Sequence, residues 1–237
     1  MKRLNMTFPE LPYSMEQSLK RLQINVAFSG YDTKKILITS SVPNEGKSLI
    51  SVQLWKMLAE AGNSAVFVDL DFRNSELVSR HSIKCVDGEE PVGLDFYLSG
   101  KAELEEVVYS TNVENGDFVP CTNLLNNPSS LFEDRRFAEL LNKLAERYRY
   151  VIIDSAPLEN VADGNQIAPH CDGAILVVRC GYVSRKIIRK SLQTLQRVGC
   201  RLLGAALNRE EKRGKFYGKY FGRDGYGYGV YETDGQR

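Results

Sequence analysis

One stretch decides the fold of this chain: residues 36–48, which read ILITSSVPNEGKS. A short apolar run ends in a small polar turn, and Gly46-Lys47-Ser48 then opens an amphipathic segment that continues to Glu60. This order predicts a strand, a phosphate-binding loop and a helix. Backbone N–H groups of such a loop, together with the N-terminus of its helix, converge on phosphate oxygens.

The loop carries side chains that suit a nucleotide. Lys47 would place a positive charge on the β- and γ-phosphates, and the Ser48 hydroxyl would ligate Mg²⁺. The full pattern for such a loop begins with glycine, and Ser41 stands at that position here. A plain helix N-terminus capped by Ser48 is therefore the alternative. The strand before the loop and the helix after it favour the phosphate site.

Two further apolar runs end in acidic residues. Residues 65–69 read AVFVD and residues 150–154 read YVIID, and continuous runs of this kind are typical of buried parallel strands. Ligands bind beyond the carboxyl ends of such strands, so Asp69, Asp71 and Asp154 should project towards the loop. Asp154 would accept hydrogen bonds from metal-bound water or from Ser48. Of Asp69 and Asp71, one would act as a base and the other would help to hold Mg²⁺, and the spacing leaves open which does which.

Strands and helices alternate along the chain. Residues 173–178 and 202–207 are two more apolar runs, and Ser184 is placed to cap the helix between them. The last run delivers Asn208 to the same edge as the acids. We predict an α/β fold of the P-loop NTPase type, with a mostly parallel sheet, helices on both faces and one domain over residues 31–208.

The two ends differ from this domain. Residues 1–30 are expected to form an arm followed by a helix, which Ser14 and Gln17 would start as a capping box. The apolar stripe of that helix would pack either on its own domain or on a neighbouring subunit. Residues 209–237 form a flexible tail rich in glycine and tyrosine, because glycines this dense disfavour regular structure.

Composition excludes several classes of protein. A net charge of +1 over 237 residues gives no general attraction to nucleic acid or to an acidic membrane. Five scattered cysteines and two histidines lack the spacing of a zinc site, and the cysteines are expected to be free thiols. No apolar run has the length of a membrane span, and no secretory signal is evident, so a cytoplasmic location is expected.

These motifs together resemble the bacterial tyrosine kinases that control capsule and exopolysaccharide synthesis, in the form of a separate cytoplasmic kinase chain. Residues 40–48 resemble the family's Walker A loop, residues 66–73 (VFVDLDFR) its Walker A′ motif, and residues 151–157 (VIIDSAP) its Walker B motif. The tyrosine-rich tail resembles the family's autophosphorylated segment. The combination of the A′ motif with that tail is the most specific part of the resemblance.

The resemblance implies ATP and Mg²⁺ as cofactors. Lys47, Asp69, Asp71 and Asp154 would be catalytic, with Asp69 as the base, and Ser48, Asp71 and Asp154 would hold the metal. Asn208 would lie near adenine. The complete set of nucleotide-binding residues would be Pro43, Asn44, Glu45, Gly46, Lys47, Ser48, Leu49 and Asn208. The phosphate acceptors would be Tyr217, Tyr220, Tyr226, Tyr228 and Tyr231.

The resemblance also implies partners. These are a transmembrane activator of the polysaccharide co-polymerase type, a cognate tyrosine phosphatase, and further copies in a homo-oligomeric ring, where one tail enters the next site. The activator would hold the chain at the inner face of the membrane. Two departures stand out. Gln17, Lys20 and Gln23 replace the family's ring motif Glu-x-x-Arg-x-x-Arg, and Asn44 replaces a usual glycine, as at a position of positive φ.

Two other functions fit the same fold. An ATPase switch of the partitioning or septum-positioning type carries a signature lysine early in the loop, where this chain has Val42. A catalytically weak module that binds ATP to dock partners would not need the acids that this chain retains. For the tail alone, alternating glycine, tyrosine and basic residues also allow RNA binding, although Asp224, Glu232 and Asp234 dilute its charge.

Overall fold

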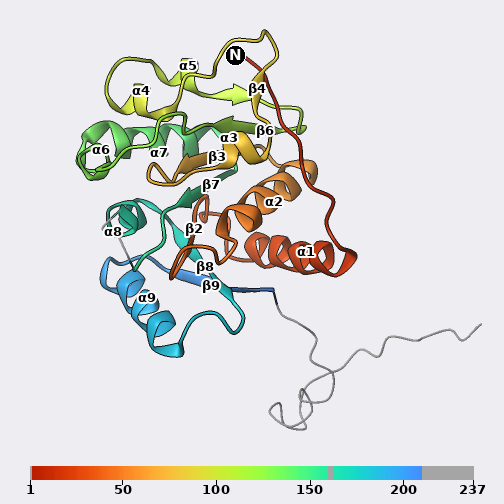
Figure 1. Ribbon diagram of the computed structural model, residues 1–237, viewed down its shortest axis with the longest axis vertical. Coiled ribbons are helices and arrows are strands. Elements are labelled where there is room, and N and C mark those ends of the chain that lie inside the picture. The colour runs from red at the N-terminus through yellow and green to blue at the C-terminus, as the bar shows by residue number, and fades with distance from the viewer. Residues whose placement is uncertain (1, 160–162, 210–237) are drawn as a thin grey trace, which may run out of the picture.

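The computed structural model describes residues 2–159 and 163–209, and its centre is a seven-stranded sheet (Figure 1). The strand order is β5-β6-β3-β7-β2-β8-β9, and every neighbouring pair is parallel except β5 with β6. This confirms the predicted α/β class with a mostly parallel sheet. The strands are β2 (Lys35–Ser40), β3 (Ala65–Leu70), β5 (Tyr109–Ser110), β6 (Gly116–Val119), β7 (Tyr150–Ser155), β8 (Gly173–Arg179) and β9 (Leu202–Asn208).

Helices connect the strands, and a separate two-stranded sheet pairs β1 (Leu4–Asn5) with β4 (Lys84–Cys85). The helices are α1 (Tyr13–Ala27), α2 (Lys47–Glu60), α3 (Leu77–Arg80), α4 (Leu94–Leu98), α5 (Leu104–Val107), α6 (Ser129–Glu133), α7 (Arg135–Arg147), α8 (Asp163–Ile167) and α9 (Arg185–Arg197), with a 3-10 turn at Ala168–His170.

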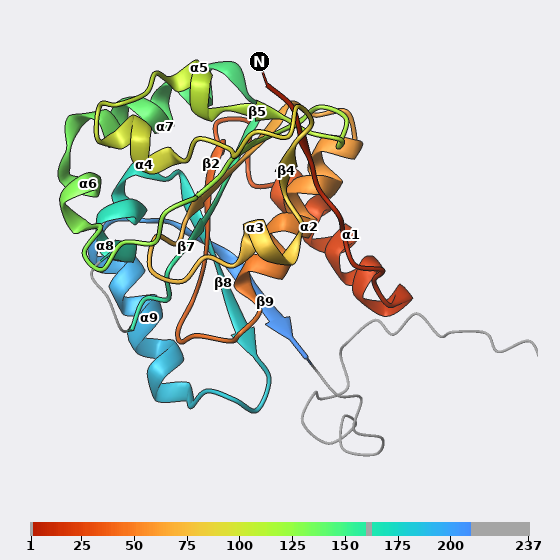
Figure 2. The ribbon, with the colours of Figure 1, turned by 45° about the horizontal axis from the view of Figure 1, so that its top comes forward.

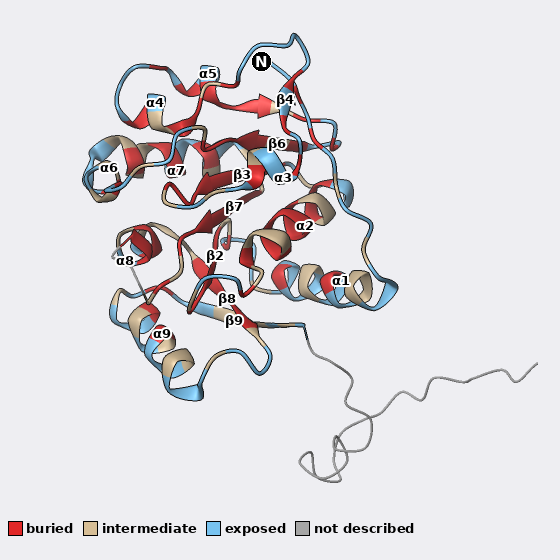
Figure 3. Cartoon of the chain, in the orientation of Figure 1, coloured by how far each residue is buried: buried red, intermediate tan, exposed pale blue. Residues whose placement is uncertain are grey.

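The central strands are buried on both faces, as their continuous apolar sequences predict. Alternate residues of each strand enter different cores, so Ile36 and Ile38 join one cluster and Leu37 joins the other. Helices α1 and α2 cover the first cluster, and α7 and α9 cover the second (Figures 1 and 3). The predicted coverage of both faces is therefore confirmed.

The register brings the polar residues to one edge of the sheet. Asp69 of β3 pairs with Asp154 of β7, and Arg179 of β8 pairs with Asn208 of β9. Strand β2, which lies between β7 and β8, ends at Ser40 and leads into the loop before α2. The expected convergence at the carboxyl ends of the strands is thus present.

The N-terminal arm is an ordered strap, although its sequence has little periodicity. Leu4 and Met6 are buried in the same cluster as the strand residues under α2. The backbone N–H of Met6 donates to the Asn112 side chain at 2.8 Å, and the Asn112 amide donates back to the Met6 carbonyl at 3.0 Å. Figure 2 shows the arm running beside β4 before it reaches α1. The arm therefore packs on the domain that follows it.

A buried histidine holds the arm in place and should make its docking sensitive to pH. The Thr7 N–H donates to the His81 carbonyl at 2.8 Å, and Nδ1 of His81 lies 2.7 Å from the Thr7 carbonyl. Burial lowers the pKa of His81 below its ordinary value of 6.5. The unfolded chain then binds a proton that the native ring does not, so the contribution of His81 to the free energy of unfolding should become less favourable as the pH drops below about 6.5.

Urea denaturation at about pH 7 and about pH 5 would measure how the free energy of unfolding changes with pH. A His81→Asn variant, which keeps a donor for Thr7, should lose less or gain more stability between pH 7 and pH 5 than the unmodified chain. A separate His170→Asn variant measures the share of the other histidine, whose pKa burial also lowers. The same pH dependence in His81→Asn and in the unmodified chain would contradict the prediction.

Some local details differ from the sequence predictions. Helix α1 begins at Tyr13 after Pro12 and shows no side-chain cap, so the capping box at Ser14 and Gln17 is wrong. The cap predicted at Ser184 is confirmed, since its hydroxyl accepts from the Ile187 N–H. Over the described ranges, no helix has both the length and the apolar character needed to cross a bilayer.

Candidate active site

The loop between β2 and α2 adopts the shape that a phosphate site requires. Gly46, just before α2, has φ of 91°, and Asn44 has φ of 65°, as predicted for an asparagine in a usual glycine position. Pro43 and Asn44 are exposed, while Ser48 and Leu49 lie in the first turn of α2. The sequence-predicted loop residues are therefore contiguous around one helix N-terminus.

Glu45 fastens this loop to the neighbouring strands. Its side chain is completely buried, and its two carboxylate oxygens accept from the N–H of Val42 at 2.9 Å and from the N–H of Arg179 at 3.1 Å. The Asn208 amide donates to the Glu45 carbonyl at 2.8 Å. The ends of β8 and β9 thus hold the loop from one side. Both Glu45 and Asn208 were predicted as site residues from the sequence, but the contact between them was not.

Lys47, Asp71 and Asp154 form a buried cluster next to the loop. The Lys47 ammonium lies 2.7 Å from Asp71, 3.4 Å from Asp154 and 3.2 Å from the Ser48 hydroxyl. Burial alone would lower the pKa of Lys47, but the carboxylates of Asp154 and Asp71 outweigh it and raise that pKa. Burial raises the pKa of Asp154, and Lys47 opposes that shift. The two carboxylates therefore stabilise the charge of Lys47, while Lys47 offsets only part of the cost of burying Asp154.

Asp69 occupies a different position from the other two acids. It is fully buried, and burial followed by the nearby Asp154 charge raises its pKa to about 7. One carboxylate oxygen accepts a short hydrogen bond from the Ser75 hydroxyl, and the other accepts from the Asp71 N–H at 3.2 Å. A carboxylate with a pKa near neutrality, fixed at both oxygens, has the properties of a general base. Sequence reasoning named Asp69 but not the role of Ser75.

Arg73, the last residue of the A′-like stretch, turns away from this cluster. Its guanidinium makes two bonds to Asp163, at 2.5 and 3.0 Å, and a third to the Asn126 carbonyl at 2.7 Å. Asp163 is almost completely buried, so the pair ties the segment after β3 to the start of α8. Asp163 follows residues 160–162, which are outside the described part. Asp163 follows neither an apolar strand nor a recognisable motif in the sequence, so the sequence could not identify it as the partner of Arg73.

The structure brings together Glu45, Gly46, Lys47, Ser48, Asp69, Asp71, Asp154 and Asn208. The five predicted acceptor tyrosines lie outside the described residues.

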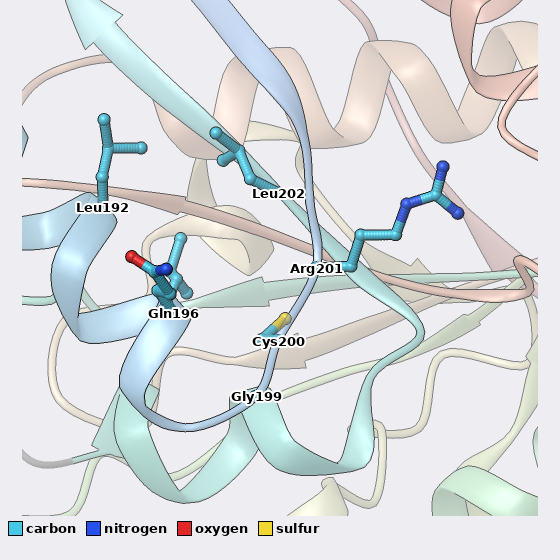
Figure 4. A pocket seen from close by; sticks show the side chains of 7 residues that line it. Leu192, Gln196, Gly199, Cys200, Arg201 and Leu202 are labelled. Atoms are coloured by element: carbon cyan, nitrogen blue, oxygen red, sulfur yellow. The ribbon is translucent and has the colours of Figure 1, made fainter.

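A separate depression, between the end of α9 and the start of β9, is lined by Leu192, Gln196, Cys200 and Leu202 (Figure 4). It lies at the start of β9, whereas Asn208 lies at the end of that strand, so the depression contributes nothing to this cluster.

The arrangement suits a metal that arrives with a nucleotide. Among the described residues, no group of at least three His, Cys, Asp or Glu side chains is placed to hold a metal ion. Mg²⁺ in phosphoryl-transfer sites needs only one or two carboxylates, because phosphates and water complete its shell. Oδ1 of Asp154 is buried and has no hydrogen-bond partner in the described part of the chain. Ser48, Asp71 and Asp154 therefore fit such an ion.

Comparison with known proteins places these features in context. A family model described as an AAA domain matches residues 33–207. The chain is 33% identical over 205 residues to the tyrosine-protein kinase CpsD of Streptococcus agalactiae, covering 86% of this chain and 88% of that protein. It is 32% identical over 212 residues to CpsD of Streptococcus pneumoniae, covering 90% and 92%. The solved kinase domain of the Escherichia coli tyrosine kinase ETK superposes with a TM-score of 0.73 at 26% identity, covering 90% of this chain and 80% of that one.

Proposed function

The chain belongs to the bacterial tyrosine-protein kinases of the capsule and exopolysaccharide type, and from that membership we propose that it transfers the γ-phosphoryl group of ATP to tyrosines of its own C-terminal segment. The acceptors would be Tyr217, Tyr220, Tyr226, Tyr228 and Tyr231. Through this reaction the chain would regulate the synthesis of a capsular or secreted polysaccharide.

The observation that carries the proposal is the cluster of Lys47, Asp71 and Asp154 beside Asp69. Phosphoryl transfer depends on positioning and charge neutralisation more than on covalent chemistry. Lys47 would leave the carboxylates to contact the β- and γ-phosphates, while backbone N–H groups of residues 44–49 bind the phosphate oxygens. Bound Mg²⁺, held by Ser48, Asp71 and Asp154, would neutralise phosphate charge.

Asp69 would take the proton of the attacking tyrosine hydroxyl. Its raised pKa and its fixed orientation between Ser75 and the Asp71 N–H support this role. Asn208, whose amide contacts the loop at Glu45, would lie on the adenine side. Exclusion of water by the buried cluster strengthens each of these electrostatic interactions.

The partners follow from the family. We propose a transmembrane activator of the polysaccharide co-polymerase type, which would hold the chain at the inner face of the membrane, and a cognate tyrosine phosphatase. Residues 1–30 would contribute to a homo-oligomer in which the tail of one copy, residues 209–237, reaches the site of the next. The exposed side chains of Tyr13, Ile24 and Phe28 on the outer side of the α1 region support such a contact.

The intact mass of phosphatase-treated protein, measured after incubation with ATP and Mg²⁺, tests the function. We expect added phosphate on the five C-terminal tyrosines and none when EDTA replaces the metal. No addition, even with the activator's cytoplasmic segment present, would favour the module that binds ATP without transferring it. Steady ATP hydrolysis without any protein phosphorylation would instead favour the ATPase switch.

A substitution at Gly46 should weaken nucleotide binding without unfolding the chain. A Cβ atom at this position would lie 2.1 Å from Nδ2 of Asn208, and the φ of +91° is strained for any L side chain. Such strain costs about 1–3 kcal/mol, so Gly46→Ala should weaken binding of Mg·ADP by roughly fivefold or more. Calorimetric titration of ADP in Mg²⁺ measures the effect.

The control for this experiment is Gly62→Ala, just beyond the other end of α2, where φ is +86° and a Cβ atom would meet no atom within 4 Å. It imposes similar backbone strain away from the loop, so its affinity for Mg·ADP should equal that of the unmodified chain. Affinity equal to that of the unmodified chain in Gly46→Ala would contradict the assigned loop geometry.

A further inference from the structure

Helix α9 presents a strongly basic face to solvent. The helix has 13 residues, and none of them is an aspartate or glutamate. All of its cations are exposed, and they lie on one side of the helix, opposite the buried Ser191 and Leu195. The cations are Arg185, Lys186, Arg189, Lys190 and Arg197.

The positions of these cations on α9 are unfavourable for the stability of the helix itself. Arg185 and Arg189 are four residues apart, as are Lys186 and Lys190, so each pair repels on the helix surface. Two of the cations stand in the first turn, where the helix dipole favours negative charge. Unfavourable choices of this kind are expected where a surface serves a binding partner.

Little within the described chain compensates these charges. Lys190 lies 3.3 Å from Glu159 across the surface. For Arg185, Lys186, Arg189 and Arg197, the described residues provide no carboxylate within ion-pair distance. Four exposed cations are therefore available to an anionic ligand.

The C-terminal segment starts close to the origin of this helix. Arg179 at the end of β8 pairs with Asn208 at the end of β9, and the Cys180 N–H donates to the Asn208 carbonyl at 2.9 Å. Helix α9 follows β8 after a short loop, and the 28 residues from 210 to 237 follow β9. Tyr217 is eight residues beyond Arg209, a reach of up to about 26–29 Å, while α9 is about 20 Å long.

Phosphorylation would reverse the charge of this segment. Residues 210–237 contain six lysines and arginines and five aspartates and glutamates, so the unmodified segment is almost neutral. Each phosphotyrosine adds about 1.5–2 negative charges, and five of them would add roughly 8–10. Arginine side chains bind such phosphates through paired hydrogen bonds.

We propose that the basic face of α9 is a phosphotyrosine-binding surface whose ligand is the phosphorylated C-terminal segment of this same chain. The proposal rests on the proposed autophosphorylation and deepens it. The unmodified segment lacks net attraction to α9 and is free to enter a transfer site. The phosphorylated segment docks on α9, which holds the modified tyrosines away from the carboxylates of that site.

Synthetic peptides test the surface without relying on kinase activity. A fluorescent peptide of residues 214–233, with its five tyrosines either phosphorylated or unmodified, is titrated with full-length, phosphatase-treated protein in the absence of ATP, and fluorescence anisotropy reports binding. We expect the phosphorylated peptide to bind at least about tenfold more tightly than the unmodified one. Saturating Mg·ADP should leave this affinity unchanged.

Charge reversal then locates the surface. Arg185→Glu with Arg189→Glu should weaken the phosphopeptide by about tenfold or more. The matched control, Lys101→Glu with Lys143→Glu, makes the same change in net charge at exposed lysines elsewhere and should change the affinity less than about twofold. The glutamate at position 185, in the first turn of α9, also suits the helix dipole, and both positions are exposed, so circular dichroism should show an intact fold.

Three results would overturn the proposal. Equal losses in the α9 variant and the control would mean that binding follows net charge alone. Competition by Mg·ADP would place the phosphopeptide in the transfer site. An α9 variant that loses sedimentation with phosphatidylserine vesicles but still binds the phosphopeptide would make this face a membrane surface. Because the peptide is synthetic, a chain that fails to phosphorylate itself still gives an interpretable binding result.

Discussion

Replacing Lys47 by methionine should reduce the rate of autophosphorylation by about 10³-fold, the usual effect of removing a group that stabilises charge in the transition state. Lys47 is buried within 3.4 Å of Asp154 and 2.7 Å of Asp71, so its ammonium is positioned where phosphate and metal charges would meet. Methionine has a similar length and fills the same space. The initial rate of phosphate incorporation, measured with ATP and Mg²⁺, gives the size of the loss.

The matched control is Lys56→Met on the same helix. Lys56 lies further along α2, where it pairs with Glu60 at the surface, 3.2 Å away. Its replacement should leave the rate within about twofold, because exposed ion pairs of this kind contribute little. A Lys47→Met variant that retained more than about a tenth of the rate would exclude Lys47 from the chemistry.

The second large effect concerns stability. Trp55→Ala should lower the free energy of unfolding by about 3–5 kcal/mol, the usual cost of removing a large buried aromatic side chain. Trp55 is fully buried, its ring centroid lies 6.0 Å from those of Phe67 and Phe118, and its Nε1–H donates to the Ala65 carbonyl at 3.2 Å. Its loss would leave a cavity and remove this side-chain hydrogen bond.

Urea denaturation followed by circular dichroism measures this effect, because Trp55 is the only tryptophan and its removal also removes that fluorescence. Phe28→Ala is the control, since Phe28 is 85% exposed and should change stability by no more than about 0.5 kcal/mol. A loss at Trp55 as small as at Phe28 would contradict the packing described for α2.

The sequence predicted the sheet and its carboxyl edge well, for a physical reason. Strands buried on both faces must be apolar throughout, and residues 65–69 and 150–154 carry that signal without ambiguity. The acids that follow them then meet at one edge because parallel strands all end there. This is why Asp69, Asp71 and Asp154 could be grouped with Lys47 from the sequence.

Other parts depend on contacts between distant residues, which periodicity does not encode. The arm is ordered because Leu4 pairs with Cys85 and Met6 meets Asn112. The Asp134 side chain caps α7, so residues 129–147 form two helices, α6 and α7, although their apolar residues alone would suit one continuous helix. Ser75 and Asp163 enter the site region through side-chain bonds to Asp69 and Arg73. The sequence pattern of each segment alone does not predict any of these contacts.

The fastening of the phosphate loop also determines which substitutions the chain can accept. Arg179 contributes only its backbone N–H to Glu45, so any side chain except that of proline, which lacks the N–H, would leave this bond intact. Position 45 is far less permissive, because glutamine offers one acceptor oxygen where two N–H groups converge, and aspartate is one carbon shorter. In a library of variants selected for nucleotide binding, residue 179 should therefore diversify while glutamate persists at residue 45.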